Sequence, residues 1–132
     1  MARMEPGEDI LTTIEAIADS YKIKSGQLTF IGAVSKANLG YFDRESQEYK
    51  SFSIEEDLEV VSGMGNISRL HDDSVVVHAH VIVADEKGKS YGGHLSRGCE
   101  VSVTIELVIQ EMKAGVRRAR DDLTGLNLLD LS

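Results

Sequence analysis

The chain has a single cysteine, Cys99, among its 132 residues, so no disulfide can form within it. A domain of this length can bury a core without disulfides or structural metals, and a lone thiol is typical of a reducing, intracellular setting. No stretch approaches the roughly 20 apolar residues that span a bilayer, and residues 1–10 lack the apolar segment of a signal peptide. We therefore expect one cytoplasmic domain over residues 1–132, with no membrane partner.

Basic residues are scarce relative to acidic ones. Lys and Arg number 14 against 22 Asp and Glu, which gives a formal net charge of -8. Affinity for nucleic acid depends on cations that neutralise phosphates, so this balance does not favour a nucleic-acid partner. The densest basic stretch contains Arg117, Arg118 and Arg120, and Asp121 and Asp122 follow it at once. We interpret it as a solvated stretch that neutralises itself, with a local basic patch as the alternative.

One segment has the periodicity of a helix. Ile10, Ile14 and Ile17 recur at helical spacing within residues 9–23 and form one apolar stripe. Acidic residues precede the stripe, near the positive end of the helix dipole. Gly26 is suited to the left-handed conformation that ends a helix, so the sequence predicts a helix that stops there.

Almost all of the remaining chain reads as strand, because it consists of short apolar and β-branched runs. The strands are expected at residues 28–34, 57–67, 74–85 and 100–112, with a hairpin of 39–43 and 47–53 around 44–46. Gly63 and Gly65 predict a bulge or bend in their strand. Residues 53–56 match a capping box, which predicts a single helical turn.

These elements predict an α+β fold, a mainly antiparallel β-sheet with one or two packed helices. No repeat or linker divides the chain. The run at residues 75–83 is apolar at odd and even positions alike, so both of its faces require cover. One helix cannot cover both faces of so many strands. A second copy of the chain is the simplest cover, and we therefore expect an oligomer.

Two histidines interrupt this apolar run. Residues two apart in a strand point to the same face, so His78 and His80 share a face, while Val77, Ala79 and Val81 occupy the other. Two imidazoles at this spacing can converge on one metal ion.

The position of a third histidine, His94, depends on the register of a hairpin. Asp85 suits the first position of a type I turn, and a glycine follows at the left-handed position of the three-residue loop 86–88. Asp85 then pairs with Lys89, and His80 pairs with His94 on one face. A loop of another length would place His94 on the opposite face.

Three clustered histidines, His78, His80 and His94, are typical of a zinc site with a position open to water or substrate, and imidazoles also bind other divalent transition metals. The alternative is a set of hydrogen-bonded histidines at a subunit interface, and spacing alone does not separate the two. Cys99 is either a fourth ligand or a small buried hydrophobic residue, and we favour the second. His71 is expected in a surface loop. No catalytic acid or base can be named: acidic residues within the strands are expected to face solvent.

The chain also resembles a known family. Residues 26–43, 78–109 and 124–131 resemble the PPC (plants and prokaryotes conserved) domain, and the resemblance runs over nearly the whole chain. Its most specific part is the H-x-H strand followed by G-G-H-L and G-C-x-V. The resemblance implies an antiparallel sheet with a few packed helices, assembled as a homotrimer, and its histidine motif maps onto the three clustered histidines. It strengthens the metal-site interpretation.

Two features depart from the family pattern. In plants this domain accompanies AT-hook DNA-binding motifs, but this chain has no R-G-R-P sequence. In addition, only M-A-R-M precedes the E-P-G-E-D motif, at a place where relatives usually have a strand. We expect a small cytoplasmic homotrimer with a trihistidine zinc site that binds a small-molecule ligand. Metal-dependent catalysis would be an extension of that role. The alternative is an oligomerisation module linked to transcription, with structural histidines.

Overall fold

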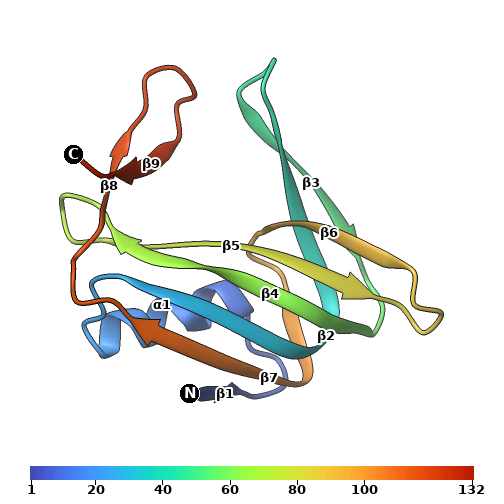
Figure 1. Cartoon of the computed structure of the whole chain (residues 1–132). Coiled ribbons are helices and arrows are strands. Elements are labelled where there is room, and N and C mark those ends of the chain that lie inside the picture. The colour runs from blue at the N-terminus through green and yellow to red at the C-terminus, as the bar shows by residue number, and fades with distance from the viewer.

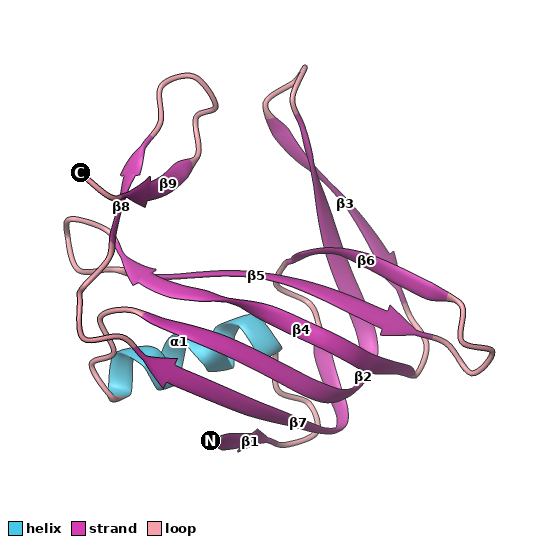
Figure 2. Cartoon of the chain, viewed as in Figure 1, coloured by secondary structure: helices cyan, strands magenta, loops and turns pink.

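The computed structural model describes residues 1–132 as a strongly curved sheet with one helix (Figures 1 and 2). All nine strands belong to this sheet, and every pairing is antiparallel except the contact of β4 with β8. The mainly antiparallel α+β fold is therefore confirmed. The elements, in chain order, are β1 (Ala2–Met4), α1 (Ile10–Ser20), β2 (Gly26–Asp43), β3 (Glu48–Ile54), β4 (Leu58–Arg69), β5 (Val75–Ala84), β6 (Ser90–Leu95), β7 (Glu100–Glu111), β8 (Arg117–Arg120) and β9 (Asn127–Asp130).

The longest strand, β2, organises the sheet. Its first half pairs with β4 on one side and β7 on the other, and its second half pairs with β6 and β3. Because β4, β5 and β6 also pair in succession, these strands and β2 form a closed ring. The two strands expected at 28–34 and 39–43 are thus one continuous strand, since the residues between them are also extended.

The helix α1 covers one face of the sheet (Figure 2). It begins after Asp9, whose side chain accepts a hydrogen bond from the backbone N–H of Thr12 (2.9 Å), a typical N-cap. The helix is shorter than expected: it ends at Ser20, and the left-handed residue beyond it is Lys22, not Gly26. Its buried residues join the core with apolar side chains from the sheet, among them Leu28, Phe30, Ile67, Val81, Val83, Ile105 and Leu107. No helix in the structure is long and apolar enough to cross a membrane.

The opposite face of the sheet carries apolar side chains without cover. Along β5, Ala79, Val81 and Val83 point into the core, and the intervening residues point outward. On this outer face Ile82 is 48% exposed, and Met64 on β4 is 55% exposed. Within this chain the outer face is covered near Ser68, by Arg118 of β8, and it is open around Met64 and Ile82.

The bulge that the sequence predicted in β4 lies just before Gly63 and not at either glycine. The register of β4 shifts between Val60 and Gly63 against both neighbouring strands, and the pairing is regular from Gly63 onward. A Cβ atom at Gly63 would lie 2.2 Å from the ring of Phe30, and one at Gly65 would lie 2.1 Å from the carbonyl oxygen of His78. These glycines are required for close packing inside the sheet.

Replacing Gly65 by alanine should therefore destabilise the protein by about 1–3 kcal/mol, the usual cost of overpacking. The clash is with backbone atoms of β5, so the strand must move. Urea denaturation measures the effect. Gly92→Ala is the matched control, because its Cβ would meet Ile82 and the backbone of Val81 at the ordinary distance of 3.4 Å. Equal stabilities of the two variants would contradict this account of Gly65.

Two hairpins rise from the same side of the sheet (Figure 1). The hairpin of β2 and β3 follows the sequence prediction. The other hairpin, β8–β9, was not predicted; β8 pairs with β4 in parallel at one position, Arg69 with Arg117. Gln47 Nε2 donates to the carbonyl oxygen of Leu123 (2.7 Å), so the two tips are in contact. Residues 53–56 form no helical turn, and the short β1 pairs with the edge of β7.

Candidate metal centre

The hairpin of β5 and β6 has the register expected from its turn. Asp85 N donates to the carbonyl oxygen of Lys89 (3.0 Å), and Gly88 adopts φ +78°. The Asp85 carboxylate accepts from backbone N–H groups inside the turn, which fixes its conformation. His80 and His94 are consequently direct cross-strand partners, as predicted.

The structure brings the three predicted histidines together on the outer face. The ring centroids of His78 and His80 lie 5.2 Å apart, those of His78 and His94 5.3 Å, and those of His80 and His94 5.7 Å. One nitrogen atom from each ring can be chosen such that all three lie within 4.8 Å of one another. His78 and His94 are half-buried and His80 is exposed, so the cluster opens to solvent on the His80 side.

Burial favours the neutral form of two of these rings. Burial, with a smaller contribution from the other two histidines, lowers the pKa of His94 to about 4. The pKa of His78 is also lowered, first by burial and then by the charges of Arg118 and His80. Both rings are neutral at pH 7, and neutral imidazole is the form that coordinates a metal ion.

The protein holds these rings by packing alone. None of the three donates or accepts a hydrogen bond within the chain, and His94 Nδ1 is buried without a partner. Tyr49 of β3 stacks on His94 with ring centroids 4.6 Å apart. Gly40 lies beneath this stack; a Cβ atom there would come within 3.2 Å of the Tyr49 ring.

The residues present fit a divalent transition metal. Three converging imidazoles are a common donor set for such ions and leave a coordination position open. An unpartnered nitrogen buried in the protein is costly, and coordination would satisfy His94 Nδ1. The arrangement lacks the carboxylate or carbonyl that usually holds the second nitrogen of a ligating histidine.

The other single residues considered from the sequence lie apart from the cluster. Cys99 belongs to the hydrophobic core and its Sγ accepts from the backbone N–H of Asn38 (3.3 Å), while burial raises the pKa of its thiol. It is therefore the small buried residue that we favoured and not a fourth ligand. His71 is exposed in the turn between β4 and β5, as expected. Glu59 and Glu106 are exposed on their strands.

The interpretation of the arginine-rich stretch as solvated was wrong for Arg118. Its side chain is buried, with 5% of the residue exposed, and it donates to Ser68 Oγ, Asn66 Oδ1 and the backbone of Asn127. Arg117 donates to the backbone of Leu70 and pairs with Asp73. Successive residues of β8 point to opposite sides, so Arg118 points onto β4 while Arg117 points away from it.

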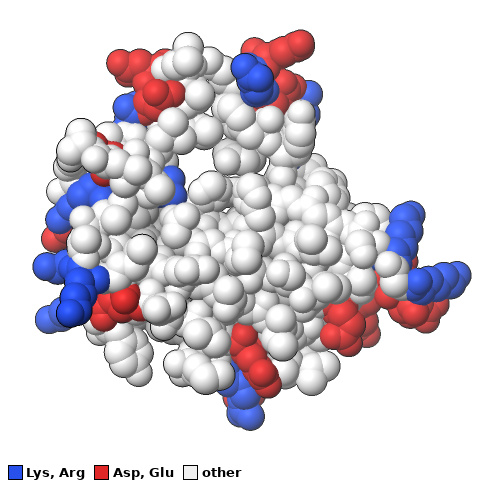
Figure 3. Space-filling model, in the orientation of Figure 1, with Lys and Arg blue, Asp and Glu red and all other residues white.

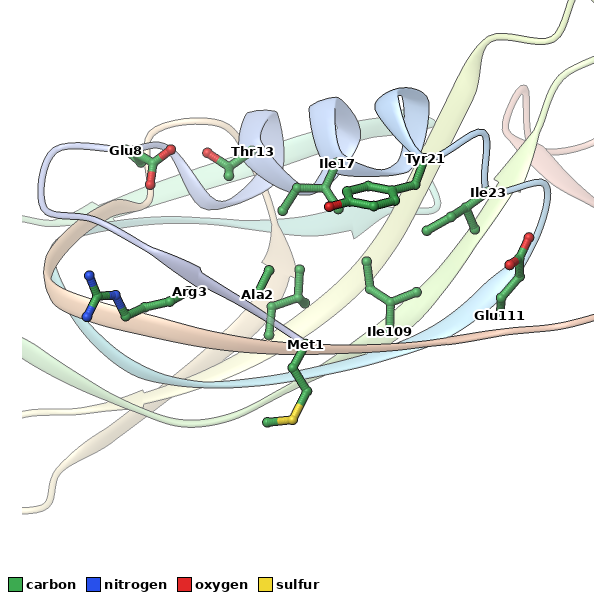
Figure 4. Close-up of a pocket in the computed structure, with 11 residues that line it drawn as sticks. Met1, Ala2, Arg3, Glu8, Thr13, Ile17, Tyr21, Ile23, Ile109 and Glu111 are labelled. Atoms are coloured by element: carbon green, nitrogen blue, oxygen red, sulfur yellow. The ribbon is translucent and has the colours of Figure 1, made fainter.

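An apolar cavity lies away from the histidines. It has a volume of about 580 Å³ and lies between α1, β1 and the edge of β7. Figure 4 shows apolar side chains along it, including Ile17, Ile23 and Ile109, with Arg3 and Glu8 at one end and Glu111 at the other. It contains no histidine or cysteine and brings no polar groups together, so we assign no site to it.

Comparison with known families identifies the domain. The family model of the Plants and Prokaryotes Conserved (PCC, or PPC) domain matches residues 1–113. The chain belongs to this family. The residues that carried the resemblance in the sequence therefore identified the PPC domain correctly, and the matched region contains all three histidines but not β8 and β9.

Solved structures show the same fold. A metal-containing protein from Archaeoglobus fulgidus is 35% identical, with a TM-score of 0.86 over 96% of this chain and 89% of that one. A PPC protein from Pyrococcus horikoshii is 33% identical, with a TM-score of 0.87 over 98% and 88% of the two chains. A protein from Bacteroides thetaiotaomicron, named for a suggested DNA-binding role, has a TM-score of 0.91 over 97% and 88% at 24% identity, which shows the fold alone.

Curated relatives carry the domain within a longer protein. A bifunctional GlmU protein of Synechococcus sp. strain JA-3-3Ab is 30% identical over 125 residues. That match covers 93% of this chain but 19% of the relative. The chain thus spans about a fifth of the length of the curated relatives it matches.

Proposed function

We propose that the protein is a cytoplasmic, homotrimeric PPC domain, residues 1–132, that binds a divalent transition metal through His78, His80 and His94. Zinc is the first candidate, because availability commonly favours it at imidazole sites. The observation that carries the proposal is the convergence of one nitrogen from each of the three imidazoles within 4.8 Å, and the buried, unpartnered Nδ1 of His94 adds to it. The similarity to a metal-containing protein of Archaeoglobus fulgidus supports it.

The open coordination position is the proposed binding point for a small-molecule ligand. A bound metal ion supplies a Lewis acid and lowers the pKa of a coordinated water to about 7. The chain contributes the orientation of the three rings, through the β5–β6 register and the Tyr49 stack. We name no general base, because no carboxylate influences the pKa of His78 or His94.

Metal analysis of the purified protein tests the proposal. We expect one zinc ion per chain after incubation with zinc and removal of the excess. At a free zinc concentration 100 times the dissociation constant, we expect the free energy of unfolding to increase by about 2.7 kcal/mol. Less than about a tenth of an equivalent per chain, not restored by added zinc, would contradict a site of this kind.

Self-association is proposed from the outer face of the sheet. Ile31, Met64 and Ile82 lie on neighbouring strands, and each is between 48% and 55% exposed. An exposed apolar face of this kind marks an interaction surface, and a second copy of the chain is the simplest partner. The trimeric number comes from the family resemblance, and the solution mass checks it.

An interaction module linked to DNA-binding proteins is the second candidate. The observation in its favour is the same apolar face, which could receive another protein, and one structural neighbour is named for a suggested DNA-binding role. Direct contact with DNA is disfavoured by the net charge of -8 and by the internal hydrogen bonds of Arg69, Arg117 and Arg118. In this alternative the histidines are structural, and substitution of His94 separates the two candidates.

A further inference from the structure

Arg118 is a buried cation without a counter-ion. Its Nε donates to Ser68 Oγ, its Nη1 to the carbonyl oxygen of Asn127 and its Nη2 to Asn66 Oδ1, each at 2.8 Å. All three acceptors are neutral, and Arg118 takes part in no salt bridge, unlike Arg69 and Arg117. A guanidinium carries more N–H groups than these bonds use, and the remaining ones have no acceptor on the chain. Burying a charge without a partner is costly, so this arrangement requires an explanation.

The guanidinium lies next to the histidine cluster. Asn66, which accepts from Arg118, is the direct cross-strand partner of His78. Paired residues point to the same face of a sheet, so Arg118 and His78 share the outer face. The guanidinium thus bonds to the side chain that stands directly opposite His78 on the neighbouring strand.

The two hairpins enclose this region. Arg118 comes from β8 and Tyr49 from β3, and the tips of their hairpins meet at the hydrogen bond from Gln47 to Leu123. Figure 3 shows an opening between the two hairpins, with the charged side chains gathered at their tips. A ligand at the cluster would therefore be flanked by uncharged surface, by the guanidinium and by the three imidazoles.

The charges of this site do not balance without an anion. A divalent ion on three neutral imidazoles adds two positive charges beside that of Arg118, and no carboxylate belongs to the histidine cluster or pairs with Arg118. We propose that Arg118 binds the oxyanion group of a small molecule, a carboxylate or a phosphate, held at the trihistidine centre. The planar fork of N–H groups on arginine matches both oxyanions. This inference rests on the metal site proposed above, and Arg118 lies beyond the residues that the family model matches.

Titration of the cobalt-loaded protein with acetate and with inorganic phosphate tests the inference. The visible absorption of cobalt reports a change in its ligands. We expect a saturable spectral change in the unaltered protein and at least a tenfold (about 1.4 kcal/mol) rise in the anion dissociation constant in Arg118→Gln, with metal content unchanged. Arg120→Gln is the matched control: it removes the same charge from an exposed position of the same strand and should leave anion binding unaltered. The acetate and phosphate arms identify which oxyanion is preferred.

The outcomes separate this inference from the metal site. If the protein takes up no metal, both proposals are contradicted. If it takes up metal but the anion causes no spectral change, or if Arg118→Gln binds the anion as tightly as the unaltered protein, only the role of Arg118 is contradicted. If Arg118→Gln fails to fold, Arg118→Lys keeps the charge, loses the planar fork and should still bind the anion more weakly. The metal affinity of the unaltered protein, measured with and without anion, gives a further test. If bound metal increases the affinity for the anion, bound anion must increase the affinity for the metal by the same factor. Equal metal affinity with and without anion contradicts the proposal.

Discussion

Replacing His94 by alanine is expected to weaken zinc binding by more than about 100-fold, since even the loss of an outer partner of a metal ligand costs 10–100-fold. The substitution removes a donor from the centre of the cluster without breaking any hydrogen bond within the chain. His94 lies outside the hydrophobic core, so the loss of its stack on Tyr49 should leave the sheet folded. Competition with a chromophoric zinc chelator measures the affinity, and circular dichroism and solution mass follow fold and assembly.

His71→Ala provides the matched control for this experiment. It is the same substitution at the one histidine outside the cluster, in an exposed turn, and it should leave zinc affinity unchanged. His78→Ala and His80→Ala should each reproduce the loss seen on replacing His94. Loss of the assembly on replacing His94, with zinc binding unaffected, would favour the interaction module and contradict the metal site.

The histidine cluster could be predicted because its geometry is local. The alternation of a strand places His78 and His80 on one face, and the short turn that begins at Asp85 sets the partner of His80. Turn chemistry depends on a few adjacent residues, all visible in the sequence. The prediction required no knowledge of the remainder of the sheet.

The residues around the cluster could not be predicted, because they come from distant strands. Tyr49 reaches His94 through the pairing of β3 and β6 with β2, and Arg118 reaches Asn66 through the parallel contact of β8 with β4. In sequence, Arg118 is adjacent to other charged residues, which suggested a solvated stretch. Only the position of β8 on the sheet shows that Arg118, alone of the three arginines, is buried, without an ion-pair partner.

Local patterns also misled where packing decides the outcome. The capping-box match at 53–56 overlaps the end of β3 and forms no helical turn, because the pairing of Ser53 and Ile54 with β2 extends the chain. Gly63 and Gly65 looked like breaks in a strand. Their function is visible only once Phe30 and the backbone of β5 occupy the space that side chains would fill. Short motifs therefore predict the turn more reliably than they predict structure within the sheet.

Replacing Met64 and Ile82 together by aspartate is expected to convert the proposed trimer into single chains. Both side chains lie on the outer face, at 55% and 48% exposure, and each points away from the core. Exposed carboxylates cost little in an isolated chain, but burying two unpaired charges in an interface costs several kcal/mol each. Light scattering after gel filtration should show the mass of one 14.4 kDa chain in place of three. Tyr21→Asp is the control, because Tyr21 is 77% exposed at the end of α1, which covers the other face of the sheet.

Zinc affinity in the same double variant distinguishes a site within one chain from a site shared between chains. All three histidines come from the β5–β6 hairpin, so a single chain supplies the complete set of ligands. Met64 is the cross-strand partner of His80, however, so the proposed interface borders the exposed side of the cluster. We expect the dissociated chain to bind one zinc ion with affinity reduced by less than about tenfold, since the ligands remain and only the exclusion of water around them is lost. A larger loss would show that the partner contributes a ligand, and an unchanged trimeric mass would place the interface on another face of the sheet.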